Sequence, residues 1–413
     1  MEYGCIGEHL KHSFSKEIHG SLAEYDYEIK EIPKEDLDAF MQTADFKAIN
    51  VTIPYKQSVI PHLYYISDTA KKIGAVNTIV NRDGKLYGYN TDFYGMTSLI
   101  EVNGIEIRGK KVLVLGSGGT SKTAVAVAES MEASEIHVVS RTVGEGVITY
   151  EDVYKSHLDA EIVINTTPSG MFPNPDAKPL DLQKFSKLSG VVDAIYNPLR
   201  SRLVLEGESL GVKAVGGLYM LVAQAAFAVE KFIGTEMKTE KIKEVYNALL
   251  KDKQNIVLTG MPASGKSTIG KKLSEATGKP FIDTDALIVK KAGKPIPQIF
   301  EEIGEMGFRR LEAEVIEEIS TLGGYIIATG GGAILNPKNI QGLKANGRIY
   351  YIDRPLSWLT ATKDRPLSSN RADLKKRYNE RYETYKSTAD VLVNAVDSLR
   401  KNVEFILKSE NEC

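Results

Sequence analysis

Two segments of this 413-residue chain share the same order: an apolar strand, a glycine-rich turn, and a helix that begins with small residues. The first covers Lys110 to Ser130 and the second covers Asn255 to Gly278. In parallel α/β proteins such a turn binds phosphates, because backbone amides and the helix N-terminus face the ligand. The glycine spacings differ, so the segments are not copies of one repeat. Each is therefore expected to open its own α/β unit.

The patterns around these loops divide the chain into three predicted domains. The length, at about 150 residues per domain, is compatible with two or three. We predict one domain over 1–98 together with 217–250, a Rossmann-type dinucleotide-binding domain over 99–216, and a P-loop NTPase-type domain over 254–413. The polar stretch Leu249–Asn255 is expected to be a short linker. The fold class is α/β throughout.

Hydrophobic periodicity places the individual elements. Strands are predicted at 47–53, 77–81, 325–330, 348–353 and 390–394, and helices at 34–43, 92–102 and within 217–250. Strands that alternate with amphipathic helices indicate parallel sheets with crossover helices. Ligands are then expected at the carboxyl ends of the strands.

Composition matters mainly for the function classes that it excludes. The 52 basic and 54 acidic residues nearly cancel, which argues against a polycationic surface for nucleic acid. No apolar run approaches the roughly 18 residues of a membrane span, and the opening residues lack a secretory pattern. Cys5 and Cys413 lie near opposite ends, so no disulfide framework is expected. We expect a cytoplasmic protein with small-molecule substrates and no nucleic-acid or membrane partner, either a monomer or a homodimer.

The first glycine loop has the form of a dinucleotide site. Five residues connect its strand to its helix: Gly116, Ser117, Gly118, Gly119 and Thr120. The next strand ends at Ser140, Arg141 and Thr142, about 25 residues beyond the first glycine, where an NAD enzyme usually has an acidic residue. An Arg at this place suits the 2′-phosphate of NADP. A solvated charge at the strand end is the alternative for Arg141.

Polar signatures before and after this loop identify a family. They are the segments 12–15 (HSFS), 50–56 (NVTIPYK), 74–78 (GAVNT), 88–92 (GYNTD), 193–198 (DAIYNP) and 217–224 (GLYMLVAQ). In this order they closely resemble shikimate dehydrogenase over most of residues 1–250. The resemblance implies a substrate-binding and catalytic domain joined to a Rossmann NADP domain, and the NADPH-dependent reduction of 3-dehydroshikimate to shikimate.

The same resemblance implies roles for individual side chains. Ser13 and Ser15 would hold the substrate carboxylate, and Lys56 with Asp92 would form a catalytic pair that also contacts the substrate. The other implied ligand contacts are Thr52, Asn77, Tyr196 and Gln224 for the substrate and Gly217 for NADP. The chemistry is consistent without the family, because reduction of a ring ketone needs a proton donor at the developing alkoxide, which a lysine beside a carboxylate supplies.

The second glycine loop satisfies a phosphate-binding motif. Residues 260–268 read GMPASGKST, which fits GxxxxGK[ST] between a strand and a helix. The predicted ATP-binding residues are Gly260, Ala263, Ser264, Gly265, Lys266, Ser267 and Thr268. The loop amides should cradle the phosphates, Lys266 should bridge the β and γ oxygens, and Ser267 should ligate Mg²⁺.

Motifs after this loop indicate the second substrate. They are DTD at 283–285, GEMGFRRLE at 304–312, TGGG at 329–332, RPL at 365–367, and Arg381 ahead of Tyr385. Together they resemble shikimate kinase across nearly all of 254–413, which implies that shikimate is phosphorylated to shikimate 3-phosphate. Asp283 would lie near Mg²⁺, directly or through water, and Arg365 would contact the transferring phosphate of ATP. The implied substrate contacts are Asp285, also the candidate base, with Arg309, Gly330, Gly331, Gly332 and Arg381.

Other interpretations of these residues stay open. Arg309 could form an exposed pair with Glu305 or Glu312 one helical turn away. Arg381 lies in a charged helix and could belong to its solvated face. The segment 358–365 has no arginine ahead of Arg365, where the family usually has one that stacks on adenine. The first half could also accept quinate, or both halves could form a metabolite-sensing regulator without activity.

Overall fold

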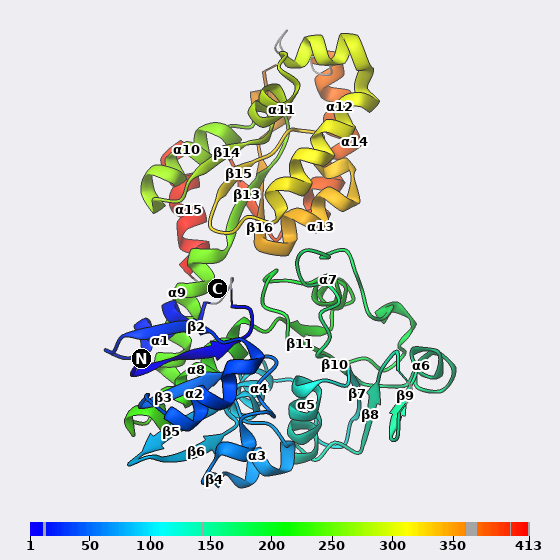
Figure 1. The fold of residues 1–413 in the computed structure, drawn as a ribbon. Coiled ribbons are helices and arrows are strands. Elements are labelled where there is room, and N and C mark those ends of the chain that lie inside the picture. The colour runs from blue at the N-terminus through cyan, green and yellow to red at the C-terminus, as the bar shows by residue number, and fades with distance from the viewer. Residues whose placement is uncertain (11–13, 143, 361–369, 397, 412–413) are drawn as a thin grey trace. The chain divides into compact units, whose positions relative to one another are not determined.

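The computed structural model describes residues 1–10, 14–142, 144–360, 370–396 and 398–411 (Figure 1). The chain divides into two compact units, Met1–Leu249 and Leu250–Cys413, which we call the first and second units. Short 3-10 turns occupy Lys34–Asp36, Ile60–His62, Leu182–Lys184, Ala333–Leu335 and Leu356–Trp358. No helix within the described ranges is both long enough and apolar enough to cross a membrane.

The first unit begins with a mixed sheet in the order β2-β1-β3-β5-β6-β4. Its strands are β1 (Tyr3–Gly7), β2 (Tyr27–Glu31), β3 (Ala48–Val51), β4 (Tyr65–Ile66), β5 (Thr78–Arg82) and β6 (Lys85–Tyr89). Strand β1 runs parallel to β2 and β3, whereas β5 is antiparallel to both β3 and β6. The helices of this part are α1 (Ser15–Leu22), α2 (Leu37–Thr43), α3 (Asp68–Ile73), α4 (Thr91–Val102) and α8 (Leu218–Ile233). The strands predicted near 47–53 and 77–81 are thus present.

A second sheet in the same unit is entirely parallel, in the order β12-β11-β10-β7-β8-β9. Its strands are β7 (Lys111–Leu115), β8 (Glu135–Val139), β9 (Val147–Ile148), β10 (Ile162–Asn165), β11 (Gly190–Asp193) and β12 (Lys213–Val215), with helices α5 (Gly119–Ser130), α6 (Tyr150–Ser156) and α7 (Arg202–Ser209). This is the usual Rossmann strand order. From β7 the chain adds β8 and β9 on one side, and then returns to add β10, β11 and β12 on the other side, so the switch point lies between β7 and β10. A crevice for a dinucleotide is expected at that point.

Helices α4 and α8 lie against each other and carry residues from distant parts of the chain to one place (Figure 1). The contact depends on Gly95, because a β-carbon there would come within 2.8 Å of the Met220 carbonyl oxygen and within 2.9 Å of the Gln224 β-carbon. A side chain at this position would push the helices apart. Glycine therefore allows the start of α4 to approach the middle of α8.

The second unit contains one parallel sheet in the order β14-β15-β13-β16-β17. Its strands are β13 (Asn255–Thr259), β14 (Phe281–Asp283), β15 (Ile326–Ala328), β16 (Gly347–Asp353) and β17 (Val391–Asn394). Its helices are α10 (Lys266–Thr277), α11 (Thr284–Ala292), α12 (Ile296–Ser320), α13 (Pro337–Asn346), α14 (Arg371–Thr388) and α15 (Leu399–Asn411). Strand β13 is central, so the loop after it lies in the middle of the carboxyl edge of the sheet. The predicted α/β fold class is confirmed in both units.

Helix α9 (Thr239–Lys253) corrects the predicted linker. The stretch Leu249–Asn255 is helical up to Lys253, and β13 begins at Asn255. The cause is a lysine outside the helix: the Lys279 ammonium donates to the carbonyl oxygens of Lys251 at 2.6 Å and Gln254 at 2.6 Å. These contacts cap carbonyls that a helix end leaves unpaired, so the last turn persists although its sequence is polar.

Candidate active sites

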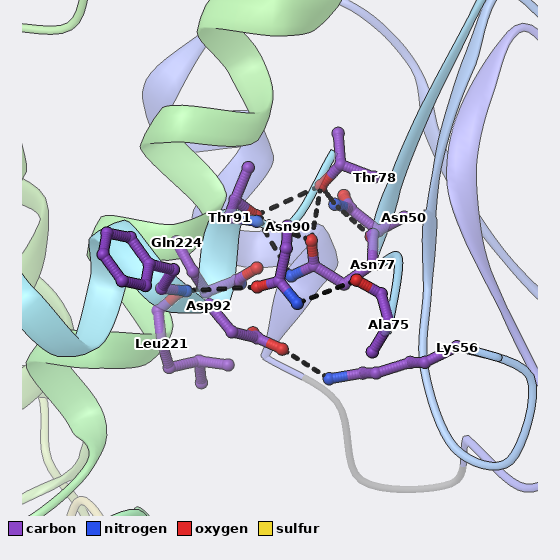
Figure 2. Close-up of polar contacts among 11 residues, drawn as sticks. Asn50, Lys56, Ala75, Asn77, Thr78, Asn90, Thr91, Asp92, Leu221 and Gln224 are labelled. Atoms are coloured by element: carbon purple, nitrogen blue, oxygen red, sulfur yellow. Dashed lines mark hydrogen bonds and ion pairs between the residues drawn. The ribbon is translucent and has the colours of Figure 1, made fainter. Parts of the chain in front are cut away.

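A lysine and a carboxylate face each other beside the first sheet (Figure 2). Lys56 lies in the turn after β3, and Asp92 lies in the first turn of α4. The Lys56 Nζ atom is 2.6 Å from Asp92 Oδ2, and the two side chains are 19% and 13% exposed. Asn90 fixes the start of α4, because its Oδ1 accepts from the Phe93 amide at 3.2 Å and its Nδ2 donates to the Ala75 carbonyl at 3.0 Å. Asp92 is thus held by the local fold, and both side chains of the pair remain partly accessible.

Asn77 is fixed next to this pair by hydrogen bonds on both sides of its carboxamide (Figure 2). Its Oδ1 accepts from the Thr91 amide at 2.7 Å, and its Nδ2 donates to Thr91 Oγ1 at 3.1 Å. The Thr78 hydroxyl donates to the same Oδ1 at 3.1 Å. Behind them, buried Asn50 donates to Thr78 Oγ1 at 3.2 Å and accepts from the Tyr27 hydroxyl at 2.7 Å. The oxygen of Asn77 is therefore occupied, which leaves one amide hydrogen to offer to a ligand.

The other predicted substrate contacts of the first unit come from several elements. Gln224 on α8 lies beside Asp92 (Figure 2), and its Nε2 donates to the Leu221 carbonyl at 2.9 Å. Ser15 begins α1, and the preceding Phe14 ring lies 5.6 Å from the Tyr196 ring. The Thr52 amide donates to the Ile6 carbonyl at 3.0 Å, so Thr52 lies at the carboxyl end of β3 and β1. Ser13 lies outside the described residues.

The first glycine loop offers free space above its backbone. Gly116 has φ of 107°, and a β-carbon there would lie 2.8 Å from Thr166 Oγ1. Around Gly118 and Gly119 nothing lies within 4 Å of such a β-carbon, so a ligand can reach the amides at the start of α5. Thr120 follows in the first turn of that helix.

The adjoining strand end and the start of α8 complete this region. Ser140 Oγ accepts from the Thr142 amide at 3.2 Å and lies 3.4 Å from Ser117 Oγ. Arg141 is exposed just after β8. Gly217, which precedes α8, approaches the Ala194 carbonyl so closely that a β-carbon would overlap its oxygen. The loop, the strand end and this glycine are the predicted NADP contacts.

A buried carboxylate not assigned a role from the sequence fastens the same edge of the Rossmann sheet. Asp193 Oδ1 accepts from Asn165 Nδ2 and from the Ile195 amide, each at 3.0 Å, and its Oδ2 accepts from the Ser201 hydroxyl at 2.5 Å. Burial raises the pKa of Asp193 to about 6, although these hydrogen bonds oppose the shift. The segment that carries Tyr196 is therefore tied to β10 and to the start of α7.

The second glycine loop closes on its own lysine. The buried Lys266 ammonium donates to the carbonyl oxygens of Gly260 at 2.9 Å and Met261 at 3.0 Å. Ala263 and Gly265 have positive φ of 65° and 96°, a conformation that turns successive amides to one side. The buried Ser264 hydroxyl has no hydrogen-bond partner among the described residues. The loop thus has the shape of a phosphate cradle, with Thr268 in the first turn of α10.

A hydroxyl and a carboxylate lie together beside this loop. Ser267 Oγ donates to Asp283 Oδ2 at 2.7 Å, and Asp283 Oδ1 accepts from the amide of Asp285 at 3.1 Å. Oxygen atoms of this kind suit Mg²⁺, which binds one or two carboxylates and completes its shell with phosphates and water. The residues present therefore fit such an ion.

Two arginines and two carboxylates surround the glycine turn after β15. Arg309 lies on α12 just beyond Gly304, whose φ of 67° breaks that helix, and its Nη1 donates to Glu312 Oε2 at 2.7 Å. Arg309 also pairs with Glu305 at 3.4 Å, whose side chain is 40% exposed, as the alternative interpretation has it, but the closer partner Glu312 is only 1% exposed. Burial raises the pKa of Glu312 although Arg309 opposes the shift. A β-carbon on Gly330 would lie 2.7 Å from oxygens of both Asp285 and Glu312.

Arg381 is buried, which contradicts the solvated-face interpretation. Its Nη1 donates to the Gly331 carbonyl at 2.8 Å, and the Tyr385 hydroxyl donates to the same oxygen at 2.5 Å. Arg381 Nη2 and Arg309 Nε are buried and have no hydrogen-bond partner among the described residues. A β-carbon on Gly332 would overlap the Arg309 guanidinium. Arg365 lies outside the described residues.

Comparisons with known proteins agree with this geometry. The family model of the shikimate dehydrogenase substrate binding domain matches residues 5–79. A shikimate dehydrogenase (NADP(+)) of Clostridium beijerinckii is 38% identical over 262 residues, which cover 59% of this chain and 96% of the relative. The chain belongs to the shikimate dehydrogenase family. A family relative from Geobacillus kaustophilus is 35% identical over 265 residues, covering 59% of this chain and 96% of its own.

Solved structures agree for the first unit. A chorismate mutase/shikimate 5-dehydrogenase fusion protein from Clostridium acetobutylicum has a TM-score of 0.57 at 36% identity and covers 60% of this chain and 96% of its own. Shikimate 5-dehydrogenase from Thermus thermophilus, in complex with NADP(H) and shikimate, has a TM-score of 0.55 at 27% identity, with coverage of 60% and 99%. The shikimate kinase family model matches residues 262–409. The chain is therefore a fusion of a shikimate dehydrogenase with a shikimate kinase domain.

Proposed function

We propose that this chain catalyses two consecutive reactions. The first unit reduces 3-dehydroshikimate to shikimate with NADPH, and the second unit transfers the γ-phosphoryl group of ATP to shikimate, which yields shikimate 3-phosphate. The proposal joins the two family resemblances through one metabolite, because the product of the first reaction is the substrate of the second. Residues 1–98 with 217–250, 99–216 and 254–413 would be the three working domains.

The ion pair of Lys56 and Asp92 is the observation that supports the reduction. The reduced nicotinamide supplies a hydride to the carbonyl carbon of the substrate. The Lys56 ammonium then donates a proton to the oxygen as negative charge develops on it. Asp92, at 2.6 Å, keeps the ammonium in place, and in the reverse reaction the neutral Lys56 amine accepts the proton back from the substrate hydroxyl. Asn77, Gln224, Thr52 and Tyr196, with Ser13 and Ser15, would orient the ring.

Cofactor choice depends on Arg141 in this proposal. The residue is exposed at the end of β8, where an acidic residue would repel a 2′-phosphate. We expect NADPH to be preferred over NADH, and Arg141→Ser to reduce that preference about tenfold, the value of one charge-assisted contact. Specificity constants of the parent and the variant for both cofactors measure this. Equal constants for the parent would refute the assignment.

The two arginines at the glycine turn are the observation that supports shikimate as the kinase substrate. Arg309 and Arg381 each have a buried N–H group without a partner among the described residues, which is costly unless a ligand accepts from it. A planar carboxylate on a small ring meets this need. Asp285, whose Oδ1 lies beside Gly330, would accept the proton of the attacking hydroxyl.

The phosphate loop would hold the nucleotide next to this glycine turn, to which the Tyr385 hydroxyl links it through the carbonyl oxygens of Gly260 and Gly331. MgATP supplies the phosphoryl group. The loop amides and Lys266 would bind its phosphates, and Ser267 with Asp283 would ligate the magnesium ion. Arg365, proposed from the sequence alone, would contact the phosphate in transfer.

One assay tests the whole proposal. Purified protein is incubated with 3-dehydroshikimate, NADPH and MgATP, and shikimate 3-phosphate is quantified by mass spectrometry. Without MgATP the reaction should stop at shikimate. The Lys266→Ala variant should also accumulate shikimate, even when MgATP is present. Lys56→Ala should form neither product but still phosphorylate added shikimate. Oxidation of quinate by the first unit in the presence of NADP⁺ would indicate the alternative substrate specificity. If the protein turns over none of these substrates, the alternative of a regulator without activity is favoured.

A further inference from the structure

Arg354 lies beside the phosphate loop although it is not part of the motif. It follows β16, which pairs with β13 so that Tyr351 lies opposite Thr259, the last strand residue before the loop. Gly260 comes so close to β16 that a β-carbon there would lie 2.8 Å from the Ile352 carbonyl oxygen. The register therefore brings the residue after Asp353 to the same edge as the loop.

The guanidinium of Arg354 reaches the start of α10. Its Nη1 atom would be 3.5 Å from a β-carbon on Gly265, the residue that precedes that helix. Its central carbon lies 5.8 Å from the centre of the Trp358 ring, which supports the cation from one side. The side chain is thus held between an aromatic ring and the phosphate loop.

No carboxylate among the described residues forms an ion pair with Arg354. Its Nε atom is buried and lacks a hydrogen-bond partner in the part of the chain that the structure describes. The adjacent Asp353 is engaged elsewhere, because it accepts from the Tyr351 hydroxyl at 3.1 Å and the Tyr382 hydroxyl at 3.2 Å. A half-buried guanidinium that has no ion-pair partner in the described part of the chain is costly unless an anion accepts from it.

We propose that Arg354, positioned by Trp358, binds a phosphate group of the nucleotide held in the loop. The proposal rests on the kinase function proposed above. Arg309 and Arg381 contact the glycine turn after β15, whereas Arg354 follows β16, the strand on the other side of β13. The shikimate carboxylate therefore already has its partners. Phosphate is the anion that the loop itself selects, and a planar guanidinium can bind two of its oxygens.

Trp358 makes the test specific, because it is the single tryptophan of the chain and is half exposed. MgADP binding to the full-length protein is measured by titration calorimetry and by tryptophan fluorescence. We expect MgADP to change the fluorescence of the parent, and Arg354→Gln to weaken the affinity about ten- to a hundredfold. The KM for ATP should rise by a similar factor while the KM for shikimate changes less than twofold.

Controls separate the possible failures. Arg400→Gln removes an exposed arginine of the same unit, paired only to Glu404 on its own helix among the described residues, and should bind MgADP like the parent. Arg354→Lys keeps the charge, so its affinity should fall between those of the parent and the glutamine variant, and it serves if the latter does not fold. Unchanged MgADP affinity in both Arg354 variants would overturn the proposal. If the parent itself does not bind MgADP, the kinase function fails and this proposal fails with it.

Discussion

Each unit places a cation against a carboxylate, yet the two pairs are built differently. Lys56 and Asp92 are both partly accessible, and the ammonium has one carboxylate partner among the described residues. In the second unit, Glu312 is almost completely buried and Arg309 shares its guanidinium between Glu312 and Glu305. A pair that must exchange a proton with a ligand needs access and a residue that can lose the proton. A pair that must hold a ligand needs a fixed, permanently charged fork.

The largest effect is expected at the proton-transfer pair. Lys56→Ala removes the donor to the developing alkoxide, so turnover in the reduction should fall about a hundred- to ten-thousandfold. Phosphorylation of added shikimate should stay within twofold of the parent, because Lys56 belongs to the other unit. Separate stopped assays of the reduction and of the phosphorylation measure these two activities. Near-normal NADPH oxidation by the variant would show that Lys56 is not the proton donor, and the two ion pairs would then not differ in the way described above.

Asp193 extends the comparison of the two ion pairs, because it is a buried carboxylate that, among the described residues, is held by hydrogen bonds rather than by a cation. The pKa of Asp193 is about 6 in the folded chain against 3.8 for a free group, so the folded state favours the protonated form. The stability that Asp193 contributes is thus present below about pH 4 and is lost as the pH rises to about 6. The difference amounts to about 3 kcal/mol. Asp193→Asn should remove this dependence, because its amide can donate to Ser201 and its oxygen can still accept from Asn165.

Denaturation of the parent and of Asp193→Asn at pH 4.5 and pH 7, followed by circular dichroism, measures this difference. Relative to the parent, the first unit of the variant should become more stable as the pH rises. The transition of the second unit, followed by the fluorescence of Trp358, is the internal control and should be the same in both proteins. A parent and variant that respond equally to pH would show that Asp193 does not titrate in this range.

A smaller effect is expected at the holding pair. Arg309→Lys keeps the charge but loses the fork, so shikimate should bind about ten- to a hundredfold more weakly while MgATP affinity changes little. Calorimetry with each ligand separates the two effects. If Arg309→Lys binds shikimate as tightly as the parent does, Arg309 does not hold the carboxylate and only neutralises the charge of Glu312.

The parts of the molecule that follow from short-range patterns could be predicted from the sequence. Both glycine loops, the strands before them and α4 are encoded in consecutive residues, since apolar runs and glycine spacing are local signals. Lys56 and Asp92 were predicted as a pair by resemblance, and the structure brings them together. Ser13 and Arg365 remain predictions, because they lie outside the described residues.

Features fixed by distant contacts could not be predicted in this way. Arg381 lies on a helix that is charged almost all round, and its burial depends on the Gly331 carbonyl fifty positions away. The last turn of α9 looks like a linker until Lys279 is placed against it. Arg354 has no motif of its own, and only the register of β16 with β13 brings it to the phosphate loop. Each of these needed the three-dimensional arrangement rather than spacing along the chain.

The packing of α8 has a consequence for the way this chain is synthesised. The core cluster around Cys5 and Val80 of the first sheet includes Ala228 and Phe232 of α8. The ribosome therefore exposes the apolar side of that sheet before its covering helix exists, and the Rossmann domain emerges in between. The second unit has a cluster of the same kind with a shorter separation along the chain, because Ile256 and Leu258 pack with Val403 and Ile406. Slow translation or a chaperone should thus matter more for the first unit, although it leaves the ribosome first.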